Sequence, residues 1–144
     1  MCEMEEQKKL APIWMKWMLI AAGIYNLCFG LVAIVFPLAV FDLIGMEPPK
    51  YIELWQCIGM IVGVYGVGYI IAGFDPVRHW PIVLVGFLGK LFGPIGMAWA
   101  VMRGSLPASF GIANVTNDLI WLIPFGCVLL FAFSNNRVNR NQTA

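Results

Sequence analysis

Two ionisable side chains, Lys90 and Asp118, stand inside long apolar runs, where charge is costly. Lys90 lies ten residues past Trp80, the start of one run, so it would be about 15 Å deep in an α-helix. Asp118 lies eight residues past Phe110 in a run of opposite direction, about 12 Å from the other surface. In a hydrocarbon core about 30 Å thick these depths nearly coincide, so the sequence predicts an ion pair at the midplane.

Polar residues surround this pair. Asn114, Asn117, Asp118 and Trp121 share one helix face by their spacing, and with Lys90 they form a predicted polar midplane cluster. One interpretation is a pocket for an ion, a proton or a small head group such as that of a quinone. The other is a satisfied pair that fixes how the helices pack.

Further residues could join or disturb this cluster. Asn26, Gln56 and Glu53 are candidates for the same polar interior, nearer the outer surface. Pro94 leaves the Lys90 carbonyl without its helical donor. A side chain such as that of Asn117, or a water, could supply the missing hydrogen bond. Pro94 and Pro124 could each break a helix.

The four cysteines suggest a second, separate chemistry. Cys28 and Cys57 would lie in the outer third of the core on neighbouring runs, where they could form a redox pair. Alternatively, they are small apolar fillers. The sequence has no C-x-x-C pair and His79 is its one histidine, so we predict neither a metal site nor a haem held by two histidines. We predict no catalytic residue.

Four apolar runs must position these residues: 13–36, 52–74, 80–101 and 110–133. Each is long enough to span a bilayer as a helix, and helices satisfy their own backbone polar groups there. The composition agrees, because 60% of residues are hydrophobic and only 12% are charged, about half the usual share of charge. The sequence therefore predicts an all-α, antiparallel bundle of four transmembrane helices in a lipid bilayer, as a single domain over residues 1–144.

Three details complete the predicted architecture. Residues 38–46 form either a short helix along the membrane surface or an apolar loop over the bundle. The polar tail 134–144 is expected to be frayed. Runs 52–74 and 80–101 each carry a stripe of small residues, so we expect these two helices to pack closely against each other. Such glycine-rich faces could also form the contact between two copies of the chain in a homo-oligomer.

Charge predicts the orientation. The six lysines and arginines expected on one side are Lys8, Lys9, Lys16, Arg78, Arg137 and Arg140, and only Lys50 and Arg103 are expected on the other. This asymmetry places both termini in the cytoplasm and the protein in the inner membrane. The acidic first residues do not fit a cleaved signal peptide. The net charge of +1 gives no basis for nucleic-acid binding.

Four blocks of the chain resemble those of a group of short, uncharacterised bacterial four-helix membrane proteins, some of which are labelled alkyl hydroperoxide reductase. The blocks are 53–60, 75–81, 93–96 and 117–121. More distantly, the architecture is similar to the DoxX-like families, and that likeness implies a quinone cofactor and a membrane redox enzyme as partner. Cys57 has no nearby lysine or arginine to activate a peroxidatic thiolate.

These observations give three functional hypotheses. The first is a non-enzymatic accessory or structural component of a redox or envelope system, with Lys90–Asp118 as an internal tie. The second is a small-solute or proton carrier that uses the same pair. The third is a membrane thiol redox protein that works through Cys28 and Cys57.

Overall fold

The structure is a computed structural model that describes residues 10–142, and every regular element in that range is helical. The elements are α1 (Ile13–Val35), α2 (Ala39–Ile44), α3 (Ile52–Phe74), α4 (Trp80–Met102), η1 (Ala108–Phe110), α5 (Gly111–Asn114), η2 (Val115–Leu119) and α6 (Ile120–Gln142). The short segments η1, α5 and η2 continue into α6 as one composite fourth helix. The predicted all-α, four-helix fold, including a short helix after the first long one, is confirmed.

Four helices are long and apolar enough to cross a membrane: Ile13–Val35, Ile52–Phe74, Trp80–Met102 and Ala108–Asn136. Large apolar side chains lie exposed along them, including Leu31, Val64 and Ile123. Such a surface suits lipid, and a soluble monomer rarely exposes so much contiguous apolar area. The fold is therefore compatible with a small multi-pass integral membrane protein.

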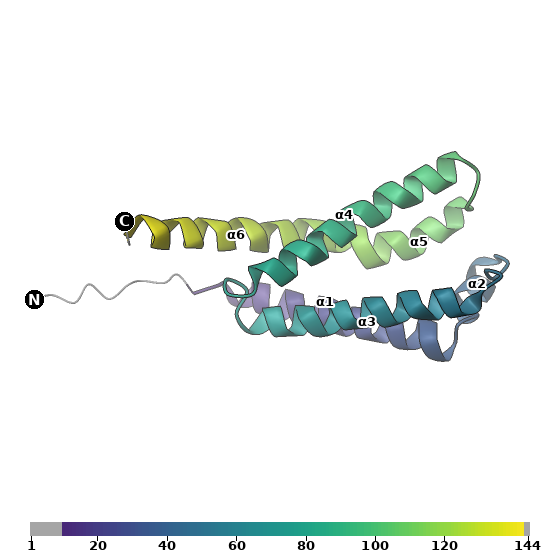
Figure 1. Cartoon of the computed structure of the whole chain (residues 1–144), viewed down its shortest axis with the longest axis horizontal. Coiled ribbons are helices and arrows are strands. Elements are labelled where there is room, and N and C mark those ends of the chain that lie inside the picture. The colour runs from purple at the N-terminus through teal and green to yellow at the C-terminus, as the bar shows by residue number, and fades with distance from the viewer. Residues whose placement is uncertain (1–9, 143–144) are drawn as a thin grey trace, which may run out of the picture.

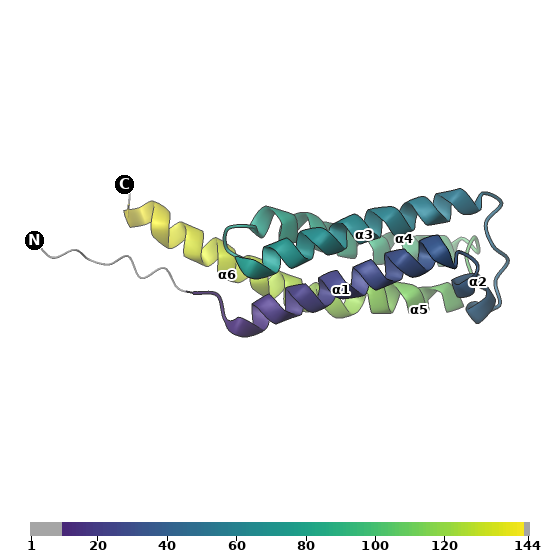
Figure 2. The ribbon, with the colours of Figure 1, turned by 90° about the horizontal axis from the view of Figure 1, so that it is seen from below.

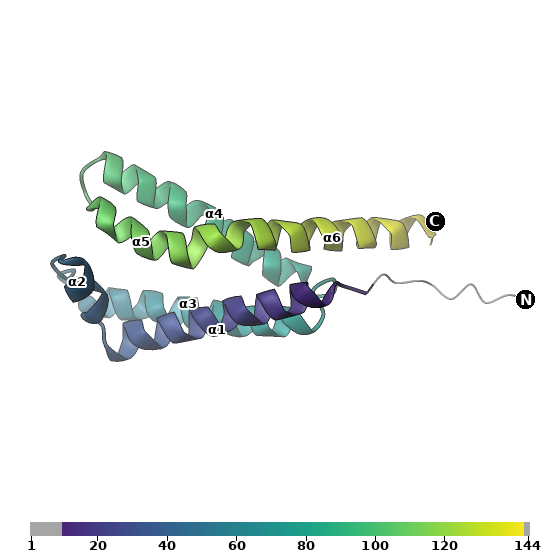
Figure 3. The same ribbon diagram turned by 180° about the vertical axis from the view of Figure 1, so that it is seen from behind.

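The long helices form two layers (Figures 1 and 2). Helices α1 and α3 lie side by side in one layer, and α4 crosses the composite fourth helix in the other. Seen from either side, α4 diverges from α3 toward the end of the molecule that carries α2 (Figures 1 and 3). We call this the α2 end. The start of α1 and the end of α6 lie at the opposite end.

The closest helix packing joins α1 and α3, through glycines that meet in antiparallel register. A Cβ on Gly23 would lie 2.6 Å from the Gly66 carbonyl oxygen, and one on Gly30 would lie 2.5 Å from that of Gly59. The expectation that the stripe on residues 52–74 packs against residues 80–101 is therefore wrong. Its partner is α1, whose two glycines are spaced by seven residues and allow the backbones to approach.

The glycines of α4 accommodate side chains from other helices. The Tyr69 ring of α3 fills the space beside Gly86, and the Asp118 carboxylate lies beside Gly93. Added Cβ atoms on Gly89 and Gly96 would meet nothing within 4 Å. The small residues of α4 thus make room for polar and aromatic groups in the interior of the bundle.

Two apolar clusters stabilise the two ends. The larger one is centred on fully buried Leu19, Val83, Phe125 and Val128, and it closes the half of the bundle away from α2. The smaller one joins Phe41 of α2 to Ala33 and Trp55. Burial of Phe41 holds α2 against the bundle, and Gly45 ends this helix with a positive φ of 66°, a conformation that favours glycine.

Some predicted boundaries need correction. The expected frayed tail is helical as far as Gln142, because residues 134–142 contain neither glycine nor proline to end the helix. Pro94 and Pro124 lie inside helices that continue past them.

Lys16 and Arg78 lie at one end of the bundle and Lys50 and Arg103 at the other, as predicted. Lys8 and Lys9 are outside the described residues.

Candidate functional site

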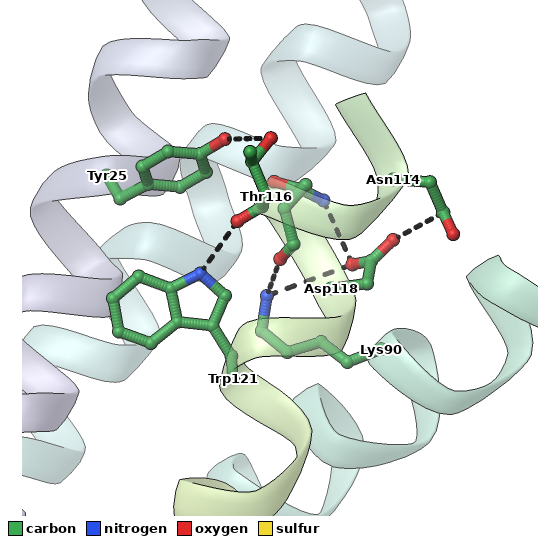
Figure 4. Close-up of polar contacts among 7 residues, drawn as sticks. Tyr25, Lys90, Asn114, Thr116, Asp118 and Trp121 are labelled. Carbon is green, nitrogen blue, oxygen red and sulfur yellow. Dashed lines mark hydrogen bonds and ion pairs between the residues drawn. The ribbon is translucent and has the colours of Figure 1, made fainter. Parts of the chain in front are cut away.

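The predicted ion pair forms in the interior of the bundle (Figure 4). Lys90 Nζ lies 3.9 Å from Asp118 Oδ1, and the two side chains are 3% and 11% exposed. The ammonium donates its short hydrogen bond to the Asn117 carbonyl oxygen, at 2.6 Å. It also lies over the rings of Tyr69 and Phe125, at 5.5 and 5.7 Å from their centroids. Lys90 is therefore held by a carbonyl, a carboxylate and two aromatic faces.

The Asp118 carboxylate is bound mainly by amides. Asn114 Nδ2 donates to Oδ2 at 2.8 Å, and Asn117 Nδ2 donates to Oδ1 at 3.0 Å. The sequence thus places Lys90, Asp118, Asn117 and Asn114 together correctly. The proposed bond from the Asn117 side chain to the Lys90 carbonyl does not occur among the described hydrogen bonds. The contact runs the other way, from the Lys90 side chain to the Asn117 carbonyl.

Trp121 belongs to a neighbouring polar group, which sequence reasoning missed in part. Its Nε1 donates to the Thr116 carbonyl oxygen at 3.1 Å, and its ring lies 6.0 Å from that of Tyr25. The Tyr25 hydroxyl donates to Thr116 Oγ1 at 3.0 Å, which links α1 to the fourth helix (Figure 4).

The polar groups converge on η2, which is a π-helical turn. Such a turn widens the helix and changes where its carbonyls point, and π turns often occur at functional sites. Here the carbonyls of Thr116 and Asn117 accept bonds from side chains, namely those of Trp121 and Lys90. The sequence does not locate this turn, because Val115–Leu119 lies inside the apolar run 110–133 and contains neither glycine nor proline.

A cavity of about 210 Å³ opens beside the pair. Lys90, Asn117, Asp118, Tyr69 and Asn26 all contribute to its wall. Its volume is several times the roughly 30 Å³ that a water molecule occupies in the liquid. We call this space the inner cavity. Of the further polar candidates, Asn26 lines it, whereas Gln56 donates instead to the Ile34 carbonyl and Glu53 is not part of its wall.

Two buried acceptors in this wall have no hydrogen-bond partner among the described residues. They are Asn26 Oδ1, on a side chain that is 3% exposed, and Asn117 Oδ1. The Asn117 amide is oriented by its Nδ2, which must face the carboxylate, so its oxygen points elsewhere. A buried acceptor without a partner costs about 1–3 kcal/mol. Both oxygens lie behind the surface of the cavity, so a hydrogen-bond donor in the cavity would reach them only after the two amides turn.

A larger pocket of about 610 Å³ meets the inner cavity at Asp118. It lies between the two layers at the α2 end and is lined by Phe41, Trp55 and Phe110 there. We call it the vestibule. Val62, Asn117 and Asp118 line both spaces, so Asp118 belongs to the floor of the vestibule, whereas Lys90 lines the inner cavity alone.

The two cysteines proposed as a redox pair are free thiols on exposed positions of α1 and α3. Neither lines the inner cavity or the vestibule, so their role as a redox pair stays a prediction. Within residues 10–142, no three or more His, Cys, Asp and Glu side chains gather as a group that could hold a metal ion.

Comparisons of the chain with protein-family models, with curated proteins and with solved structures found no match. Its function must therefore be argued from the geometry of the site itself.

Proposed function

We propose that this chain is a non-enzymatic membrane component that holds a small hydrogen-bond-donating solute or head group against the Lys90–Asp118 pair. The observation that carries this proposal is the inner cavity, whose wall combines the pair with the amide side chains of Asn26 and Asn117. Each amide has an unpartnered oxygen, so a ligand with hydroxyl or amine groups would satisfy both once the amides turn toward the cavity.

A purely structural tie explains these features less well. A charge-assisted hydrogen bond between ammonium and carboxylate would bring the two atoms to about 2.7–2.9 Å, whereas Lys90 Nζ and Asp118 Oδ1 are 3.9 Å apart. A tie would also be packed on all sides, and here 210 Å³ of cavity adjoins the pair. The pair does join α4 to the fourth helix, so it serves packing as well as binding.

The charges at the site restrict the ligand. Lysine and aspartate together carry no net charge, so a neutral ligand is favoured over an ion whose charge would need a further partner. A quinone, the cofactor that the DoxX-like resemblance implies, presents carbonyl acceptors to these acceptor atoms and is poorly matched. Its hydroxyl-bearing reduced form matches them better. An accessory role in a redox or envelope system stays a prediction.

A carrier is the second candidate, because a large pocket leads to Asp118 in the interior of the bundle. The vestibule reaches the pair from the α2 end, while the cluster of Leu19, Val83, Phe125 and Val128 closes the opposite half. Transport would require this cluster to separate in a second conformation, whereas binding requires no such change. Binding is therefore favoured over transport.

The proposal is tested by what the protein retains on purification. Wild type and Asn26→Leu are purified in parallel from bacterial membranes, and their small-molecule extracts are compared by mass spectrometry. Leucine has nearly the shape of asparagine and removes the unpartnered acceptor. The control is Ile24→Leu, at an exposed position of the same helix.

We expect a hydroxyl- or amine-bearing compound in wild type and the control that is depleted in Asn26→Leu. Adding the wild-type extract back to delipidated protein should raise Tm for wild type and not for the variant, because binding stabilises the folded state. Identical extracts and identical Tm responses would leave the pair as a structural tie.

A further inference from the structure

The line along which α3 and α4 face each other, which we call the seam, is closed at one end and open in the middle. A Cβ on Gly68 of α3 would lie 3.1 Å from Ile82 Cγ2 of α4, so the two helices touch there. Gly89 follows Ile82 by seven residues and therefore faces the same way. A Cβ on Gly89 would meet nothing within 4 Å, in agreement with the divergence of α4 from α3 toward the α2 end (Figures 1 and 3).

The α3 side of the seam shows the same opening. Ile61 precedes Gly68 by seven residues, so it also faces the seam. Its side chain is 57% exposed, and Gly89 is exposed as well. Both residues line the inner cavity. The inner cavity therefore reaches the outer surface of the bundle between α3 and α4.

This opening lies halfway along two helices that are long and apolar enough to cross a membrane. Ile61 is nine residues past Ile52 and Gly89 is nine residues past Trp80, which is about 14 Å from the start of either helix. In a hydrocarbon core about 30 Å thick, both residues lie near the midplane. The bilayer core holds no water to solvate polar groups, so lipid hydrocarbon lies outside the opening.

The inside of the opening is polar, because Lys90, Asp118 and two amide side chains line the cavity. A hydrocarbon chain offers these groups no hydrogen bond, and a phospholipid keeps its own head group at the membrane surface. An ion would have to cross hydrocarbon without its hydration shell, which is costly. A molecule that enters here must therefore be uncharged, dissolve in the bilayer and carry a small polar head.

We propose that the ligand of the inner cavity is an uncharged amphiphile of the long-chain alcohol type, which enters from the bilayer through the seam between Ile61 and Gly89. Its hydroxyl group lies beside the Lys90–Asp118 pair, and its apolar body lies along the seam against Ile61. This inference rests on the proposed function, because it names the class of molecule that the pair holds and the side from which that molecule arrives.

The test uses the full chain in lipid nanodiscs and two photoreactive probes of equal length. One is dodecanol with a diazirine close to the hydroxyl group, and the other is dodecane with a diazirine at the same position. Labelled residues are identified by mass spectrometry. The informative positions are Asn26 and Tyr69, which line the cavity and are only 3% and 2% exposed, so a probe that stays outside the bundle does not reach them.

We expect the alcohol to label Asn26 and Tyr69 about tenfold more than the alkane does, the effect of one buried hydrogen bond. Gly89→Phe fills the opening and should abolish this labelling. Gly96→Phe is the matched control, because Gly96 has the same open surroundings on the same helix but does not line the cavity. The control should be labelled as wild type is.

A reversible closure of the seam separates blocked entry from misfolding. In a background that lacks the four native cysteines, Ile61→Cys and Gly89→Cys are joined by a bifunctional thiosulfonate reagent, which a reductant removes. Labelling of Asn26 and Tyr69 by the alcohol should disappear when the two cysteines are joined. It should return on reduction of the same sample.

The inference is overturned if the alcohol fails to label Asn26 and Tyr69 in the wild type, or if both closures leave that labelling unchanged. Equal labelling by the alkane would also overturn it, because the cavity would then be a crevice for lipid chains. So would labelling that is lost in Ser105→Phe, at the wall of the vestibule, and kept in Gly89→Phe, because the entrance would then lie at the α2 end.

The outcomes for the two proposals are separable. A purified protein that retains a compound dependent on Asn26, but whose labelling ignores closure of the seam, would reject this inference and leave the proposed function standing. Labelling that depends on the seam, in a protein that retains no such compound, would reject the proposed function alone.

Discussion

At the residue scale, the surroundings of Lys90 explain how an ammonium is stable inside an apolar bundle. A carbonyl at 2.6 Å and a carboxylate at 3.9 Å supply negative charge, and two ring faces cover the remaining side. The depth of Lys90 and Asp118 could be predicted from helix rise alone. The carbonyl of Asn117 and the ring of Tyr69 could not, because they depend on a π turn and on the rotation of α3.

Single substitutions at the pair should be far more harmful than the double substitution. Lys90→Leu or Asp118→Leu leaves one buried charge without its partner, which costs about 3–5 kcal/mol. The double variant removes both charges and should recover most of that loss while losing the ligand. A double-mutant cycle of unfolding free energies in detergent measures the coupling. Additive losses would contradict a direct interaction between the two residues.

Asn26 should behave in the opposite way. Because its Oδ1 is buried without a partner, Asn26→Leu removes an unsatisfied acceptor and should stabilise the ligand-free protein by about 1–3 kcal/mol. The measurement is the unfolding free energy of delipidated protein. A loss of stability would mean that Asn26 serves packing and not ligand binding.

At the element scale, small residues decide which helices touch. Stripes on runs 52–74 and 80–101 look equivalent in the sequence, and nothing in either stripe identifies its partner. The partner of α3 is α1, where Gly23 and Gly30 match the spacing of Gly66 and Gly59. The spacing of seven residues does not single out this pairing, because Gly86 and Gly93 of the run 80–101 have the same spacing. The π turn η2 could not be predicted either.

Gly30→Ala should destabilise the α1–α3 contact. A Cβ there would lie 2.5 Å from the Gly59 carbonyl oxygen, so the backbones must separate, at a cost of about 1–3 kcal/mol. Gly63→Ala on the facing helix is the matched control, because its Cβ would meet nothing within 4 Å. We expect the control to be neutral or slightly stabilising. Equal effects on unfolding free energy would refute the packing described.

Gly93→Ala should disturb the site through α4. Its Cβ would lie 2.8 Å from Asp118 Oδ2, the atom that accepts from Asn114. We expect loss of that charge-assisted hydrogen bond, which is worth about 1.5–3 kcal/mol, and weaker ligand retention. Gly96→Ala, one turn further along α4 with open space around it, should change neither quantity. If both variants retain the ligand at the wild-type level, the ligand does not bind beside Asp118.

At the scale of the whole molecule, the two layers meet in one half and diverge in the half that carries α2. The first half contains the fully buried cluster around Leu19 and Phe125, and the half that carries α2 contains the vestibule, which reaches Asp118. The four helices and the central pair follow from hydrophobic runs and their lengths. The divergence of the layers depends on side-chain packing between distant segments, such as Tyr69 against Gly86, which the local pattern does not encode.

The predicted orientation places the open half toward the outside of the inner membrane. In a background that lacks the four native cysteines, Ser105→Cys at the α2 end should react with a membrane-impermeant maleimide added to intact spheroplasts. Arg78→Cys, in the link at the opposite end, should react only after the membrane is broken. The reverse pattern would invert the orientation, and the vestibule would then face the cytoplasm.

The most direct measurement is an experimental density map of the protein purified in native lipid. We predict density for a non-protein molecule in the inner cavity, beside the Lys90–Asp118 pair and in contact with the amide groups of Asn26 and Asn117. A collapsed cavity, with both amide oxygens bonded to protein side chains and the ammonium of Lys90 in direct contact with Asp118, would contradict it.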